Sequence, residues 1–93
     1  MTAAPVSPRA ELVLISRQDC ELCEQMLSEL EQLRHRMPLP PLRITDVDSD
    51  PQLQRRHGLH VPVLLLDGSV VCRHRLDVAE LRRLLRPAPA AGG

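Results

Sequence analysis

The sequence contains no Phe, Tyr, Trp or Lys. Proteins that bind single-stranded nucleic acid usually stack its bases on aromatic side chains, so this absence argues against such a platform. The twelve basic residues, all Arg, are balanced by twelve acidic ones. The resulting net charge of zero argues against a phosphate-binding surface and against a polybasic membrane-binding surface. We therefore expect neither nucleic acid nor a membrane among the partners of this protein.

Long apolar runs are also missing. The longest covers residues 61–66, far fewer than the roughly 20 residues that a membrane-spanning helix needs. The first residues lack the charged start and apolar core of a secretory signal. Three cysteines in a short chain differ from the even, dense set of a secreted disulfide scaffold. We expect a protein of a reducing compartment, the cytoplasm.

The length of 93 residues predicts one domain, with a core that buries roughly 60–65% of the surface of the unfolded chain. Without aromatic residues, that core has to consist mainly of Leu, with Val, Ile, Met and Ala. Residues 1–10 and 87–93 are rich in Ala and Pro and show no apolar periodicity, which predicts flexible tails. The folded unit is expected at residues 11–86, as a monomer.

The first part of the folded unit shows two apolar patterns, one typical of a strand and one typical of a helix. Residues 11–16 form a continuous apolar run, typical of a central strand that is covered on both faces. The next apolar residues are spaced four, four, three and four apart, which predicts one buried stripe on a helix over residues 21–36. The stripe consists of Leu22, Met26, Leu30, Leu33 and Met37. The prolines that follow end the helix.

The remaining pattern predicts a second strand at 42–47, a short helix at 51–57, two further strands at 60–66 and 69–74, and a last helix from residue 78. Asp50-Pro51 is a helix start and Gly58 a stop. Asp67-Gly68 is a hairpin turn, and Asp77 caps the last helix, whose buried stripe is expected at Val78, Leu81, Leu84 and Leu85. Together these elements predict an α/β fold, β-α-β-α-β-β-α, in which a four-stranded mixed sheet is flanked by helices.

Two cysteines, Cys20 and Cys23, lie where the first strand gives way to the first helix. A Cys-x-x-Cys pair at such a junction places the first sulfur over the helix N-terminus, whose free N–H groups and partial positive charge favour a thiolate. The second sulfur lies close enough to form a disulfide with the first. We therefore predict that Cys20 is the nucleophile and that Cys23 is the resolving thiol.

The chain resembles the glutaredoxin-like group of the thioredoxin-fold superfamily over residues 11–86. The motifs that carry this resemblance are Cys20-Glu21-Leu22-Cys23, Asp46-Val47-Asp48 with Asp50-Pro51, Gly58-Leu59-His60-Val61-Pro62-Val63-Leu64, and Asp67-Gly68. The resemblance implies the minimal thioredoxin fold and the activity of a thiol–disulfide oxidoreductase. Such an enzyme reduces protein disulfides or glutathione mixed disulfides, with no bound cofactor and with glutathione as a co-substrate.

The resemblance also implies a substrate-binding site. The proline matching Pro62 follows a cis peptide bond and faces the two cysteines, and the backbone of Val61 binds substrate as an added strand. A basic residue three positions before the first cysteine, here Arg17, holds a glutathione carboxylate.

Glutaredoxins usually carry Pro-Tyr between the cysteines and Gly-Gly after the hairpin, where this chain has Glu21-Leu22 and Cys72-Arg73. An alternative interpretation is a non-catalytic binding module with the same fold. Such a module would use the Val61-Pro62 edge, or hold a metal or an iron–sulfur cluster through its cysteines. A zinc site usually needs two short cysteine knuckles and only one is present, so we expect no metal. Cys72 is either a third redox thiol or a small buried hydrophobe.

Overall fold

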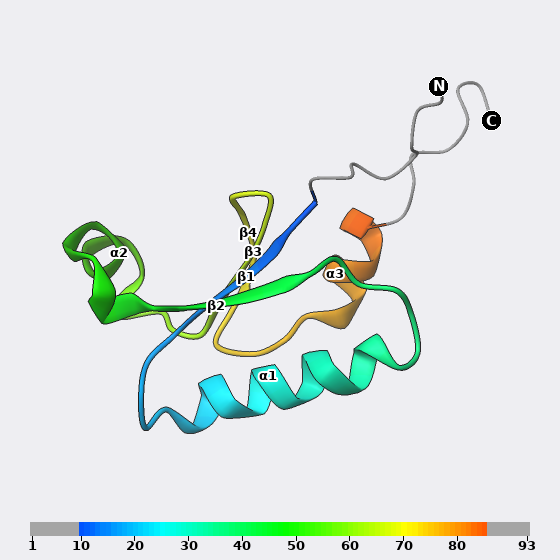
Figure 1. Ribbon diagram of the computed structural model, residues 1–93, viewed down its shortest axis with the longest axis horizontal. Coiled ribbons are helices and arrows are strands. Elements are labelled where there is room, and N and C mark those ends of the chain that lie inside the picture. The colour runs from blue at the N-terminus through cyan, green and yellow to red at the C-terminus, as the bar shows by residue number, and fades with distance from the viewer. Residues whose placement is uncertain (1–9, 86–93) are drawn as a thin grey trace.

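The computed structural model describes residues 10–85. Its elements are β1 (Leu12–Ser16), α1 (Glu21–Arg34), β2 (Leu42–Asp46), the 3-10 helix η1 (Val47–Ser49), α2 (Pro51–His57), β3 (Val63–Leu66), β4 (Ser69–Arg73) and α3 (Val78–Leu85) (Figure 1). The predicted element order is confirmed, with η1 added. Apart from Ala10, the two expected tails lie outside the described residues. No helix within residues 10–85 is long and apolar enough to cross a membrane.

The four strands form one mixed sheet in the order β2-β1-β3-β4. The first strand pairs in parallel with β2 and antiparallel with β3, so it is central, as predicted. The last two strands form the predicted hairpin. Its turn residues Asp67 and Gly68 have φ angles of 50° and 87°, and positive φ at both positions is what a tight hairpin turn requires.

Side chains of β1 alternate between two faces of the sheet, as the geometry of a strand dictates. Leu12 and Leu14 point toward α1 and α3, whereas Val13 and Ile15 point toward η1 and α2. The larger buried cluster consists of Leu12, Leu14, Met26, Leu30, Leu33, Leu64 and Leu81. The smaller consists of Ile15, Val47 and Val63. Both faces of the sheet are therefore covered, and in Figure 1 α1 runs below the strands while α2 lies at the left.

Some boundaries and buried positions differ from the predictions. Helix α1 ends at Arg34 rather than at residue 36, and its buried side chains are Cys23, Met26, Leu30 and Leu33. The predicted stripe placed Leu22 in the core, but Leu22 is 37% exposed, because the buried Cys23 fills the core-facing position. Val47 leaves the second strand and is buried in η1. Leu84 is 39% exposed, so the buried face of α3 is narrower than predicted.

A matched pair of leucines tests this assignment of the core. Leu30 is fully buried and Leu59 is 91% exposed. We expect Leu30→Ala to lower the free energy of unfolding by about 2–5 kcal/mol, because it leaves a cavity. Leu59→Ala should change it by less than about 0.5 kcal/mol. Urea unfolding of both variants measures the difference, and equal losses would contradict the assignment.

Candidate active site

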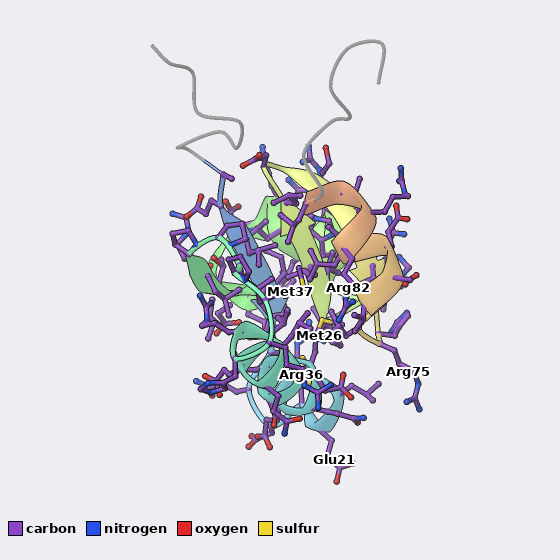
Figure 2. The ribbon with its side chains drawn as sticks, turned by 90° about the vertical axis from the view of Figure 1, so that its right-hand side faces the viewer. Glu21, Met26, Arg36, Met37, Arg75 and Arg82 are labelled. Atoms are coloured by element: carbon purple, nitrogen blue, oxygen red, sulfur yellow. A yellow bond between two sulfur atoms is a disulfide. The ribbon has the colours of Figure 1, made fainter. Side chains whose placement is uncertain are left out.

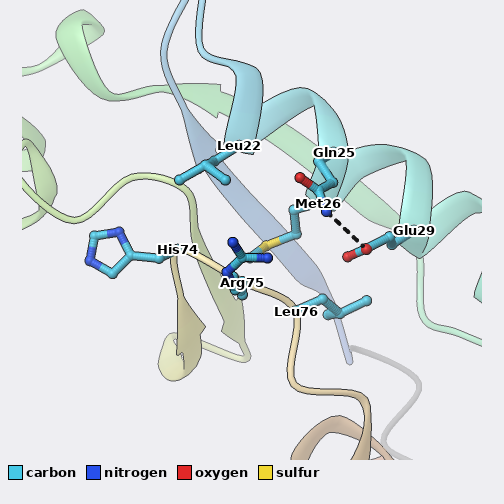
Figure 3. A pocket seen from close by; sticks show the side chains of 7 residues that line it. All are labelled: Leu22, Gln25, Met26, Glu29, His74, Arg75 and Leu76. Carbon is cyan, nitrogen blue, oxygen red and sulfur yellow. Dashed lines mark hydrogen bonds between the residues drawn. The ribbon is translucent and has the colours of Figure 1, made fainter.

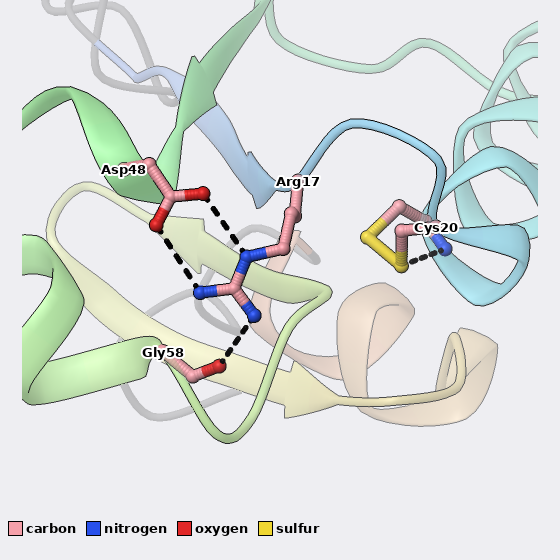
Figure 4. The surroundings of a disulfide bond; sticks show 5 residues. Arg17, Cys20, Asp48 and Gly58 are labelled. Atoms are coloured by element: carbon pink, nitrogen blue, oxygen red, sulfur yellow. Dashed lines mark hydrogen bonds and ion pairs between the residues drawn. A yellow bond between two sulfur atoms is a disulfide. The ribbon is translucent and has the colours of Figure 1, made fainter.

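The two cysteines form a disulfide at the start of α1 (Figure 4). Their Cα atoms are 5.2 Å apart. Cys20 is the N-cap residue, in an extended conformation, and its Sγ accepts a hydrogen bond from the backbone N–H of Cys23 at 3.2 Å. Cys20 is partly exposed, while Cys23 is only 4% exposed. The sulfur that solvent and a substrate can reach is therefore that of Cys20.

The segment before β3 contains the expected cis peptide bond, between Val61 and Pro62. Pro62 is buried, and its carbonyl oxygen accepts a hydrogen bond from the backbone N–H of His74 at 2.8 Å. The rings of His60 and His74 meet edge to face with their centroids 6.1 Å apart. Within residues 10–85, the backbone N–H and C=O of Val61 have no hydrogen-bond partner. Pro62 is thus held in place while the polar backbone groups of Val61 remain open.

Arg17 follows β1 in the chain and is hydrogen-bonded to Asp48 of η1 and to Gly58 at the end of α2 (Figure 4). Its Nε and Nη2 donate to the two carboxylate oxygens of Asp48 at 3.1 and 3.3 Å, and its Nη1 donates to the carbonyl oxygen of Gly58 at 3.2 Å. Gln54 Nε2 donates to the same carboxylate at 2.7 Å. The hydrogen bonds with Asp48 raise the pKa of Arg17, and those from Arg17 and Gln54 lower the pKa of Asp48. All three guanidinium nitrogens already have a partner.

Asp48 is the site residue that the sequence analysis did not single out as a partner of Arg17. The signal was nevertheless present, because β1 and β2 are parallel neighbours. The carboxyl ends of parallel strands lie at the same edge of a sheet, so a residue that follows β1 meets one that follows β2. The register from Leu12↔Leu42 to Ser16↔Asp46 places these two strand ends side by side.

Cys72 lies on β4, opposite Leu64, and packs against the larger buried cluster. Its side chain is partly buried, and burial raises the pKa of its thiol. A raised pKa leaves less of the reactive thiolate. The structure therefore favours the interpretation of Cys72 as a small hydrophobe.

The described part of the chain contains no set of side chains that would serve the metal-binding alternative. Within residues 10–85, no group of three or more His, Cys, Asp or Glu side chains is arranged so that it could hold a metal ion. Three of the four histidines, His35, His60 and His74, are exposed.

A cavity of about 120 Å³ lies beside the cysteine pair, between α1 and the segment that follows β4 (Figure 3). It is lined by Leu22, Gln25, Met26, Glu29, His74, Arg75 and Leu76. Leu22 lies between the two cysteines, and His74 is bonded to Pro62. The cavity therefore lies between the helix that carries the cysteines and the residue that is hydrogen-bonded to the cis proline. The apolar spacing of α1 did not predict this cavity, because that spacing places Leu22 in the core.

His57, in the last turn of α2, is only 7% exposed, and its Nδ1 has no hydrogen-bond partner within residues 10–85. Burial lowers the pKa of this side chain, because it disfavours the charged imidazolium. The charges of Arg56, Arg73 and His60 lower it further. His57 is therefore neutral in the native protein at neutral pH.

The lowered pKa of His57 predicts that the protein loses stability in mild acid. As the pH falls through the ordinary histidine pKa of 6.5, the unfolded chain takes up a proton that native His57 resists, so unfolding becomes more favourable. This residue should contribute a slope of at most about 1.4 kcal/mol per pH unit. The measurement is urea unfolding between about pH 7.5 and 5. His57→Gln should flatten the slope and His35→Gln, at an exposed position, should not; an unchanged slope in His57→Gln would contradict the prediction.

Comparisons with known proteins agree with this architecture. Residues 11–86 match the model of the glutaredoxin-like domain family (DUF836). The structure is similar to that of protein Ne2328 from Nitrosomonas europaea, with a TM-score of 0.76, 28% identity, and coverage of 92% of this chain and 100% of that one. It is also similar to protein XcR50 from X. campestris, with a TM-score of 0.63, 34% identity, and coverage of 84% and 99%.

Thioredoxin 1 from Thermosipho africanus has a TM-score of 0.54 at 15% identity, covering 81% of this chain and 93% of that one, and this likeness shows the fold alone. The comparison with curated proteins found no match. The predicted fold is confirmed as the thioredoxin fold, and the family model covers nearly the whole described chain. The chain belongs to the glutaredoxin-like family of thioredoxin-fold proteins.

Proposed function

We propose that this protein is a dithiol oxidoreductase that reduces disulfides by thiol–disulfide exchange. The observation that carries the proposal is the cysteine pair itself. A partly exposed Cys20 caps α1, a buried Cys23 lies one turn further on, and the two are close enough to form a disulfide. A cysteine pair at a helix N-terminus that can interconvert between the dithiol and disulfide forms is suited to thiol–disulfide exchange.

In the reduced protein, the Cys20 thiolate attacks one sulfur of a substrate disulfide. The bond between the two substrate sulfurs breaks, a mixed disulfide with Cys20 forms, and the other substrate sulfur leaves as a thiolate that takes a proton from water. The Cys23 thiolate then attacks Cys20 Sγ and releases the second substrate thiolate. Two electrons have passed to the substrate, and the protein carries the Cys20–Cys23 disulfide. Two glutathione molecules or one external dithiol return it to the dithiol form.

The surroundings of the two cysteines support the proposed roles of Cys20 as the nucleophile and Cys23 as the resolving thiol. The backbone N–H of Cys23 points at Cys20 Sγ, and the N-terminus of α1 carries partial positive charge, so both favour a thiolate on Cys20. The Cys23 side chain is shielded from external disulfides, so its accessible target is the neighbouring Cys20 Sγ once that sulfur carries the substrate. The open N–H and C=O of Val61 offer an edge on which a substrate segment can add as a strand.

A disulfide-containing protein is the substrate that this site fits best, with glutathione as the reductant. Asp48 and Gly58 take three of the five N–H groups of the Arg17 guanidinium, and the Asp48 carboxylate already balances its charge, so a glutathione carboxylate would have to compete with Asp48 for this residue. We assign Arg17 to the substrate-binding site on this basis as a residue that orders the loop before Val61 and Pro62. The proposal includes a monomer in the cytoplasm, where reductants keep thiols reduced.

Replacing each cysteine separates catalysis from mere binding. Cys20→Ser should lower disulfide reduction to the uncatalysed rate, because the attacking sulfur is gone. Cys23→Ser should accumulate the mixed disulfide on Cys20, because the resolving sulfur is gone. The measurements are turnover of an insulin-type protein disulfide with a glutathione regenerating system, and intact mass after acid quench.

Cys72→Ser serves as the matched control and should keep the wild-type rate. Full activity of Cys20→Ser would contradict the proposal. A double variant, Cys20→Ser with Cys23→Ser, that still captured partners as the wild type does would favour the binding-module alternative instead.

A further inference from the structure

A second cavity, of about 280 Å³, continues from the one beside the cysteine pair. The two cavities adjoin, because Glu29 and Leu76 line both, and we name them together the α1–α3 groove. It begins at Leu22, next to the disulfide, and ends between Arg36, just past the end of α1, and Arg82 of α3. Its apolar lining residues are Met26, Leu33, Leu76 and Val78, of which Met26 and Leu33 are buried.

The rim of the α1–α3 groove carries surplus positive charge. Arg36, Arg75 and Arg82 line it and are exposed, and Glu29 is the one acidic side chain among the lining residues. Figure 2 labels these three arginines on the side of the molecule where α1 ends and α3 lies. Glu29 itself accepts a hydrogen bond from Gln25 at 3.4 Å (Figure 3).

No carboxylate side chain of the protein neutralises these arginines. All twelve Asp and Glu residues of the sequence lie in its described part. The ion pairs among residues 10–85 join Arg17 to Asp48, Arg43 to Glu11 and Arg83 to Glu80. Among residues 10–85, Arg36, Arg75 and Arg82 therefore have no ion-pair partner, and their guanidinium groups can bind a ligand in the groove.

The start of α1, where the cysteine pair lies, carries charge of the opposite sign. Asp19, Glu21 and Glu24 are exposed around the start of α1. An acidic chain that leaves Cys20 across these carboxylates is repelled, and one that leaves along the α1–α3 groove is attracted. This asymmetry selects a direction for a substrate segment.

We propose that the α1–α3 groove binds an extended, acidic segment of the substrate protein, next to the disulfide that Cys20 attacks. This inference rests on the proposed function and names its class of substrate. The path from Leu22 to Arg36 along α1 is about 20 Å at the rise of a helix. An extended polypeptide covers it with about six residues, whereas a tripeptide such as glutathione spans only about 10 Å. Glutathione bound through its sulfur at Cys20 therefore does not reach Arg36 or Arg82.

Two disulfide-bonded peptides test the proposal. In one, the reactive cysteine is flanked by a run of glutamates about six residues long, enough to reach the far end of the groove; in the other, the run is glutamine. Each is made with the run on either side of the cysteine. With the full chain at low ionic strength, kcat/KM for the better glutamate peptide should exceed that for its glutamine counterpart by about fivefold, as expected for two exposed ion pairs. The preference should vanish at about 0.5 M salt, where screening is strong.

The variant Arg36→Gln with Arg82→Gln should lose most of this preference. The matched control, Arg34→Gln with Arg55→Gln, removes the same charge from exposed positions outside the groove and should keep it. Equal turnover of both peptides by the wild type, an undiminished preference in the groove variant, or an equal loss in the control would overturn the proposal.

Binding measurements separate this inference from the proposed function. Peptides in which serine replaces the reactive cysteine report docking without exchange, by fluorescence anisotropy with the wild-type protein. A fivefold preference for the glutamate peptide in binding, without turnover of the disulfide peptides, would support the groove as the binding site for an acidic segment and contradict the proposed exchange activity. Turnover of both disulfide peptides, with no preference for glutamate in either assay, would support the exchange activity and contradict the proposed role of the groove.

Discussion

The central strand β1 is the element on which the rest of the structure depends. It pairs with β2 on one edge and β3 on the other, and its side chains alternate into both buried clusters. Leu12, Leu14 and Ile15 are almost completely buried, so this strand cannot shift in register without exposing core residues. The position of its carboxyl end is therefore fixed by the core, and Arg17 and Cys20 come shortly after this end in the chain.

Local patterns were sufficient to predict most of the fold. The continuous apolar run of β1, the Asp50-Pro51 start of α2 and the Asp67-Gly68 turn each specify a conformation through residues adjacent in the chain. The Cys-x-x-Cys pair at a strand-to-helix junction was identified on the same basis, and the pair lies there in the structure. The cis bond before Pro62 required the resemblance to a family, since no local pattern specifies it.

The features that the sequence did not reveal depend on packing between distant segments. Cys23 rather than Leu22 fills the core-facing position of α1, because the sheet below selects which side of the helix is buried. The partner of Arg17 is Asp48, which becomes a neighbour only through the parallel pairing of β1 and β2. The α1–α3 groove likewise exists only because two helices distant in sequence lie on the same face of the sheet.

The proposed exchange mechanism requires that the Cys20–Cys23 pair oxidises reversibly. The most direct measurement equilibrates the protein in glutathione buffers of graded potential, quenches with acid, alkylates the free thiols and locates them by mass. We predict one two-electron transition confined to Cys20 and Cys23, with a midpoint between about −180 and −300 mV. No reversible oxidation of this pair across that range would contradict the exchange mechanism.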